Sequence, residues 1–220
     1  MTAAIAETAA ATERAGQSGA GAAAATDIAF RIGPNAVIQL LSALRSAGRH
    51  DLAAEACAAA GMPEWLDSPP SEMVDERIVA RLHRAVRAAL PLDAANLIMA
   101  EAGRLTALYL LANRIPRPVQ LLLKCLPSRT AASILVKAIS AHAWTFAGSG
   151  TFTAQVGNPT VFTLSNNPLI AGERAEHPLC AWHTAVFERL FQALVSRRTH
   201  AAETECEAEG DITCRFILRW

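Results

Sequence analysis

The spacing of apolar residues changes near Gly148, and this change constrains the fold more than any other feature of the sequence. Before it, apolar residues recur every three or four positions, as they do between Val74 and Val86, which predicts amphipathic helices. After it, β-branched and aromatic residues from Thr151 to Leu164 surround Gly157-Asn158-Pro159, a pattern typical of two strands joined by a turn. The sequence therefore predicts a helical first two-thirds, followed by a region that contains strands.

Prolines, glycines and capping residues mark the ends of the expected elements. The expected helices begin after Gly33-Pro34, run from Asp51 to Gly61, begin at Ser71, run from Pro91 toward Leu111, and begin at Pro116 and Pro127, the last reaching Trp144. Pro178 begins one more helix, and two final strands follow around residues 202–207 and 212–219, joined by a turn at Glu209-Gly210-Asp211.

Composition indicates one domain behind an N-terminal tail. Residues 1–26 are mainly Ala with Thr, Gly, Glu and Ser and show no sustained apolar period, so we expect a disordered tail. Residues 27–220 have the length of a single domain, which begins with an extended piece around residues 28–32. The 20 basic and 20 acidic residues balance, which disfavours a nucleic-acid partner.

Membrane and secretion signals are not expected from this sequence. No apolar run approaches the roughly 20 residues that a membrane-spanning helix needs. The N-terminus lacks the basic start and apolar core of a secretory signal, so we expect a cytoplasmic protein with reduced cysteines. Cysteines in that compartment are more often ligands or nucleophiles than disulfides. Cys57 and Cys125 lie among apolar residues, and we interpret both as small core residues.

Three cysteines in the C-terminal third are positioned to share a metal ion. Cys206 and Cys214 flank the last turn, and Cys180 lies in the first turn of the preceding helix, where the helix dipole favours a thiolate. Three thiolates favour zinc, and a fourth ligand would close a tetrahedral structural site. From spacing alone the fourth ligand stays open, and the candidates are Glu203, Glu205, His183 and His200.

The series Cys180, Glu203-x-x-Cys206 and Cys214 resembles the zinc signature of the 4-vinyl reductase family of small-molecule-binding domains. In that family the ligands are three cysteines and a glutamate, so the resemblance implies structural zinc on Cys180, Glu203, Cys206 and Cys214, in a part spanning about residues 148–220. Strand alternation would place Glu203 and Cys206 on opposite faces. The resemblance therefore requires Glu203 to lie in irregular backbone or at a bulge.

Segments that begin at Arg31, His142 and Cys180 are similar to the members of this family that act in bacteriochlorophyll biosynthesis, from about residue 28 to the C-terminus. The resemblance implies an α+β fold, with the helical N-terminal two-thirds packed on an antiparallel sheet, similar to the small vesicle-tethering (TRAPP) subunits. It also implies pairing into a homodimer. Peripheral association with photosynthetic membranes is compatible with a sequence that has no transmembrane segment.

The family name implies reduction of the 8-vinyl group (4-vinyl in older numbering) of divinyl protochlorophyllide. The sequence shows no glycine fingerprint for a nicotinamide or flavin and no iron–sulfur cysteine spacing, so whether the protein is an enzyme stays open and no catalytic residue is assigned. We favour a carrier that binds a magnesium tetrapyrrole, divinyl protochlorophyllide or a precursor, and passes it to pathway enzymes. The alternatives are the vinyl reductase itself and an interaction scaffold for those enzymes.

A tetrapyrrole needs flat apolar walls and one axial ligand for its magnesium. In the segments that carry the resemblance, Trp144, Phe146 and Trp182 are the candidate walls. His142 and His183 are the candidate axial ligands. We interpret Asn166-Asn167-Pro168 as a turn.

Overall fold

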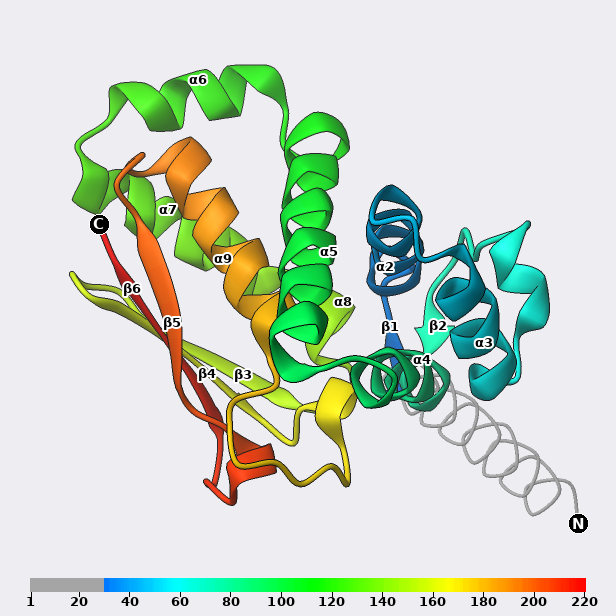
Figure 1. Cartoon of the computed structure of the whole chain (residues 1–220). Coiled ribbons are helices and arrows are strands. Elements are labelled where there is room, and N and C mark those ends of the chain that lie inside the picture. Colours follow the sequence, from blue (N-terminus) through cyan, green and yellow to red (C-terminus); the bar gives the residue numbers. More distant parts are fainter. Residues whose placement is uncertain (1–29) are drawn as a thin grey trace, which may run out of the picture.

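The computed structural model describes residues 30–220, shown in Figure 1. The predicted tail, residues 1–26, and the first residues of the predicted extended piece lie outside the described part of the chain. A short strand, β1 (Arg31–Ile32), pairs antiparallel with β2 (Val74–Asp75). None of the helices from residue 30 onward has both the length and the apolar character needed to cross a bilayer.

A four-stranded antiparallel sheet forms one side of the molecule (Figure 1). Its order is β3 (Thr151–Gln155), β4 (Thr160–Ser165), β6 (Cys214–Arg219) and β5 (His200–Glu205). The inner face carries buried Phe162 and Phe216, because alternate side chains of a strand point to the same face. Helix α9 (Ala181–Leu194) covers this face, and the rings of Phe162 and Phe187 lie 4.8 Å apart.

The other helices build outward from α9. Helix α5 (Leu92–Asn113) packs along α9, and α2 (Asn35–Ser46) packs on the opposite side of α5 (Figure 1). Helices α3 (His50–Ala60) and α4 (Glu76–Ala88) lie beyond α2, next to the short helix η1 (Pro63–Leu66). Helices α6 (Arg117–Cys125), α7 (Ser128–Ala141) and α8 (Trp144–Ala147) connect α5 to the sheet. The predicted α+β fold, helices packed on an antiparallel sheet, is confirmed.

Two predicted helix ends are wrong. The helix expected from Ser71 begins at Glu76, where the side chain of Asp75 caps it by accepting a hydrogen bond of 2.8 Å from the backbone N–H of Arg77. The intervening residues Val74–Asp75 are a strand because β1 offers them a partner. The helix expected to reach Trp144 ends at Ala141, and α8 follows it as a separate short helix.

The C-terminal elements lie close to their expected ranges. The hairpin across Gly157-Asn158-Pro159 is confirmed, and the Asn158-Pro159 peptide bond is cis. The helix expected from Pro178 begins three residues later, at Ala181. Strand β5 ends at Glu205, so Cys206 lies just beyond it, before the short helix η3 (Glu207–Glu209).

Candidate metal centre

Cys180 is positioned by the start of α9. It immediately precedes the first helical residue, one position before the predicted first turn, and it is 2% exposed. Its backbone N–H donates a hydrogen bond of 2.8 Å to Oε2 of Glu203 on β5. This bond joins the helix to the last hairpin beside the cysteine side chain.

A β-bulge brings Glu203 and Cys206 to the same face of the sheet. Glu203 lies opposite Phe216, which points into the core. The register then shifts between Glu203 and Glu205, so that an extra residue of β5 is accommodated against β6. Cys206 is consequently turned inward and fully buried. The irregular backbone required at Glu203 is therefore present.

Cys214 begins β6 and pairs with Leu164 of β4, and both side chains are buried on the inner face. The turn before it contains Gly210 in the left-handed region, with φ of 105°. The carboxylate of Asp211 accepts a hydrogen bond of 2.8 Å from the backbone N–H of Cys206, which holds the turn closed. The hairpin therefore presents both sulfurs to the start of α9.

The four predicted ligands form one cluster. One sulfur or carboxylate oxygen from each of Cys180, Glu203, Cys206 and Cys214 lies within 4.8 Å of the others, and Sγ of Cys180 is 3.5 Å from Sγ of Cys214. A tetrahedral ion with metal–sulfur bonds of about 2.3 Å separates its sulfurs by about 3.8 Å. This group could therefore hold a metal ion without a large rearrangement.

The charges of the cluster favour a bound cation. Burial raises the pKa of the Cys180 thiol and raises the pKa of Glu203 to about 8. The pKa of Cys214 is raised to about 12, because its hydrogen bond with Cys180, which lowers it, is outweighed by the hydrogen bond with Cys206 and by burial. The pKa of Cys206 is lowered because the other two thiols donate hydrogen bonds to it. Without a cation, these buried groups cannot all ionise together.

One oxygen of Glu203 fits a metal ligand directly. Within residues 30–220, its Oε1 atom is buried and has no hydrogen-bond partner, whereas Oε2 accepts from the backbone of Cys180. A buried carboxylate oxygen without a partner is costly unless it binds a cation. The other candidates from spacing lie elsewhere, since His200 pairs with Glu188 and Glu205 with Arg215.

Asn167 supports the sulfurs, and sequence reasoning missed this role. Its side chain is 1% exposed, and its Nδ2 donates to Sγ of Cys180 at 3.2 Å and to Sγ of Cys214 at 3.7 Å. Its Oδ1 accepts from the backbone N–H of Leu169, and its own backbone N–H donates to the carboxylate of Glu207. The Asn167-Pro168 pair correctly indicated a turn, but a turn signal alone does not say what the side chain contacts.

Replacing Asn167 by aspartate should weaken metal binding. The substitution keeps the Oδ1 acceptor for Leu169 but removes the Nδ2 donor and places a negative charge beside the sulfurs. We expect metal affinity to fall by about 10- to 100-fold, as for other hydrogen-bond partners of metal ligands. Competition with a chromophoric chelator measures this, with Asn166→Gly as the control because glycine tolerates the φ of 54° at that residue. Unchanged affinity in Asn167→Asp would contradict the supporting role.

Three of the proposed tetrapyrrole contacts gather in one aromatic cluster. Trp182 and His183 are buried at the start of α9, with ring centroids 4.9 Å apart, and Phe146 of α8 lies 6.2 Å from His183. The other two, His142 and Trp144, lie at the surface after α7, and Trp144 is 49% exposed. The structure thus brings Phe146, Trp182 and His183 together and leaves the other two outside.

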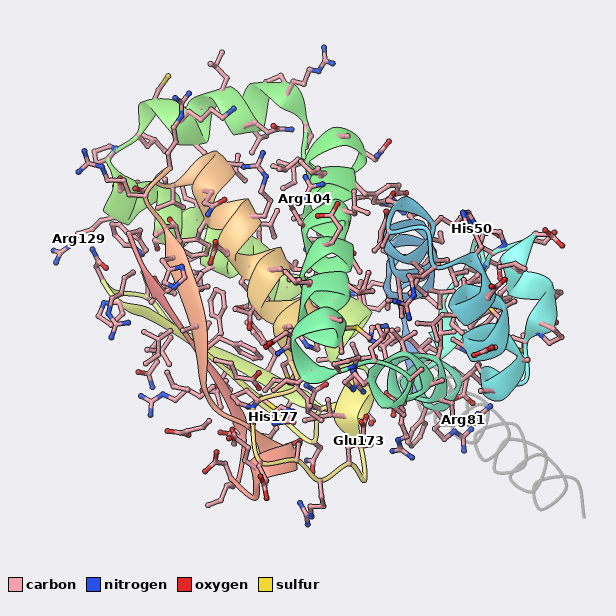
Figure 2. All side chains as sticks on the ribbon, in the orientation of Figure 1. His50, Arg81, Arg104, Arg129, Glu173 and His177 are labelled. Carbon is pink, nitrogen blue, oxygen red and sulfur yellow. The ribbon has the colours of Figure 1, made fainter. Side chains whose placement is uncertain are left out.

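A separate polar cavity of about 520 Å³ lies between α4 and the loop that contains Asn167. Its lining includes Arg77, Arg81 and Arg84 of α4, together with Asn167 and Glu207. Figure 2 shows Arg81 on α4, with Glu173 on the loop that faces this helix. None of the five proposed tetrapyrrole contacts lines this cavity.

Comparison with known proteins extends these observations. The family model of the vinyl-4-reductase domain matches residues 160–220, which include all four candidate ligands. Among solved structures, one from a study of heme distortion in the H-NOX family has a TM-score of 0.53 and 14% sequence identity, and the match covers 86% of this chain and 95% of that one. At this identity the likeness shows a shared fold alone.

Two curated relatives match nearly the whole chain. The bacteriochlorophyll synthase 23 kDa chain of Cereibacter sphaeroides is 47% identical over 191 residues, which are 87% of this chain and 91% of that protein. The protein of the same name from Rhodobacter capsulatus is 39% identical over 189 residues, 86% of each chain. Identity at this level over this length confirms the resemblance read from the sequence, and the chain therefore belongs to the family of bacteriochlorophyll synthase 23 kDa chains, with a vinyl-4-reductase domain at its C-terminal end.

Proposed function

We propose that this protein binds a magnesium tetrapyrrole of the bacteriochlorophyll pathway, divinyl protochlorophyllide or a precursor, and carries it to pathway enzymes. The observation that carries the proposal is a group of buried ring nitrogens without partners. Among residues 30–220, Nδ1 of His83, Nε1 of Trp182 and Nε2 of His183 are buried and have no hydrogen-bond partner. Such atoms are costly in a closed core and are expected where a ligand binds.

His183 has the properties of an axial ligand. Burial lowers its pKa to about 3, against a hydrogen bond to the backbone of Phe146 that raises it, so the ring is neutral at physiological pH. That hydrogen bond uses one ring nitrogen, and the lone pair of Nε2 is left for a metal. His83 is also neutral, with a pKa lowered to about 3 chiefly by burial, and its ring lies 6.3 Å from that of Trp182.

In this proposal Trp182 and Phe146 are the flat walls on either side of the macrocycle. Their rings now pack against His183, so binding requires a local opening. The four-residue helix α8, which carries Phe146, is the segment we propose to move. It is tied to the N-terminal part by a hydrogen bond of 2.7 Å from the backbone N–H of Gly33 to the carbonyl of Thr145. His142 and Trp144 then form the outer rim of the site.

The comparisons support a tetrapyrrole as the ligand. The curated relatives are named for bacteriochlorophyll synthesis. The H-NOX structure that shares the fold comes from a study of heme distortion, and heme is another tetrapyrrole. Pathway enzymes are accordingly the proposed recipients, in the cytoplasm. The homodimer implied by the sequence resemblance stays a prediction, which sedimentation of the purified chain tests.

We further propose that the metal of the C-terminal cluster is zinc in a structural role. Three thiolates and one carboxylate suit zinc better than magnesium or calcium, and four protein ligands fill a tetrahedral site. When bound, zinc would supply a positive charge that joins α9 to the last hairpin. The cluster residues themselves would hold the start of α9, and hence Trp182 and His183, in place.

Titration with divinyl protochlorophyllide tests the carrier proposal. We expect a shift in its absorption spectrum and quenching of tryptophan emission, with affinity reduced at least about tenfold in His183→Ala and unchanged in His200→Ala, an exposed control. Addition of NADPH or reduced ferredoxin should leave the vinyl group intact. Loss of the vinyl group would instead show a reductase, and the absence of any spectral shift would favour the interaction scaffold.

A further inference from the structure

Helix α6 turns its apolar face away from the protein. Its inner face consists of Gln120 and Leu123, and the amide of Gln120 donates to the carbonyls of Leu111, at 2.5 Å, and Ile115, at 2.8 Å. The outward face carries apolar side chains exposed to solvent: Pro118, Leu121, Leu122 and Cys125. Leu121 is 66% exposed and Leu122 is 57% exposed. The expectation that Cys125 is a core residue is therefore wrong, because the apolar face of α6 points outward.

The charges around α6 are all of one sign. Between Ala102 and Gly172 the sequence contains no acidic residue, although it contains six basic ones: Arg104, Arg114, Arg117, Lys124, Arg129 and Lys137. Exposed Arg197 and Arg198 follow α9, in a connection that lies beside the start of α7 because Ser128 donates to the carbonyl of Val195 at 3.2 Å. The chain has no net charge, so this end of the molecule is basic and the remainder is correspondingly acidic.

We propose that α6 and the basic residues beside it form a docking surface for an anionic phospholipid bilayer. An exposed apolar helix face flanked by Lys and Arg is the pattern of helices that lie in the membrane interface. Leu121 and Leu122 insert at the boundary between head groups and acyl chains, while Arg117 and Lys124 contact lipid phosphates. Figure 1 shows α6 lying across one end of the molecule, and Figure 2 labels Arg129 at the adjoining start of α7.

Charge favours a bilayer over a second copy of this chain. A symmetric pair of α6 surfaces would bring Arg117, Lys124 and Arg129 of the two copies near each other, and like charges at an interface oppose association. Anionic lipid head groups instead neutralise the same residues, each contributing about 1 kcal/mol, or about fivefold in affinity, near a charged membrane. The proposal is independent of tetrapyrrole binding.

Co-sedimentation of the full chain with lipid vesicles tests this surface. We expect binding to vesicles that contain phosphatidylglycerol, little binding to pure phosphatidylcholine, and weaker binding at high salt. The double variants Leu121→Gln/Leu122→Gln and Arg117→Gln/Lys124→Gln should each bind at least about tenfold more weakly. The matched control is Leu97→Gln, because Leu97 is 72% exposed on α5 and lies outside the proposed surface.

A probe on Cys125 locates the contact. The other four cysteines are buried, so an environment-sensitive fluorophore should react at Cys125 and shift its emission to the blue on anionic vesicles. Absence of binding to these vesicles, or undiminished binding of the leucine double variant, would overturn the proposal. So would a chain that ignores vesicles but is a dimer that the leucine variant converts to a monomer, since α6 would then be a dimer interface.

Discussion

Replacing Cys214 by serine should remove the bound metal and lower the thermal stability of the protein together. Cys214 belongs to the last hairpin and Cys180 to the start of α9, so the metal joins two elements that otherwise meet only through packing and hydrogen bonds. Because the binding free energy of a structural metal is part of the folding free energy, we expect a loss of about 3 kcal/mol or more. Elemental analysis and thermal unfolding of the same preparation measure both effects.

The same substitution at Cys125 is the matched control. Its thiol is exposed on α6 and outside the cluster, so Cys125→Ser should change neither metal content nor unfolding temperature. Metal binding by the parent protein should weaken as pH falls, because the thiols and Glu203 must lose protons to bind. A parent protein that is metal-free as purified, yet as stable and protease-resistant as after zinc addition, would contradict the structural metal.

Replacing Gly103 by alanine should destabilise the fold through the contact between α5 and α9. A Cβ atom at this position would lie 2.2 Å from the carbonyl oxygen of Trp182 and 3.0 Å from Cβ of Ala185. Since the first of these is a backbone atom, the helices must move apart, at a cost of about 2 to 3 kcal/mol after a gain of about 1 kcal/mol in helix propensity. At this chain length, that corresponds to a fall of roughly 5 to 10 °C in unfolding temperature.

The reverse substitution in the same helix isolates the propensity contribution. Ala112 is exposed on α5, so Ala112→Gly should cost only about 1 kcal/mol. Circular dichroism melts of the two variants and the parent compare them directly. A Gly103→Ala protein that melts above the parent would show that propensity alone acts and that the two helices do not approach closely at Gly103.

Much of the fold follows from local pattern. The hairpin between Thr151 and Ser165 was predictable because Gly157-Asn158-Pro159 interrupts alternating strand residues, and turn chemistry acts over a few residues. The four candidate ligands were predictable from their types and spacing, through the family that shares them. The choice of Glu203 over His183 depended on that resemblance, because alternation alone placed Glu203 on the wrong face.

Contacts between distant segments decided the rest. The helix expected at Ser71 begins later because Asp75 pairs with Arg31, which is far away in sequence and leaves no local signal. Gly103 is a poor helix former in isolation, and only its contact with Trp182 explains its place.

The site and the surface show the same division. The residue types at positions 180, 203, 206 and 214 determined which atoms could bind a metal, because ligand chemistry belongs to each side chain. The bulge in β5 and the amide of Asn167 determined that those atoms meet. The amphipathic pattern of α6 is visible in the sequence, but which face it buries depends on where Gln120 finds carbonyl partners. A sequence pattern sets the period of a helix or strand, whereas the direction in which a face points is decided by packing against the rest of the chain.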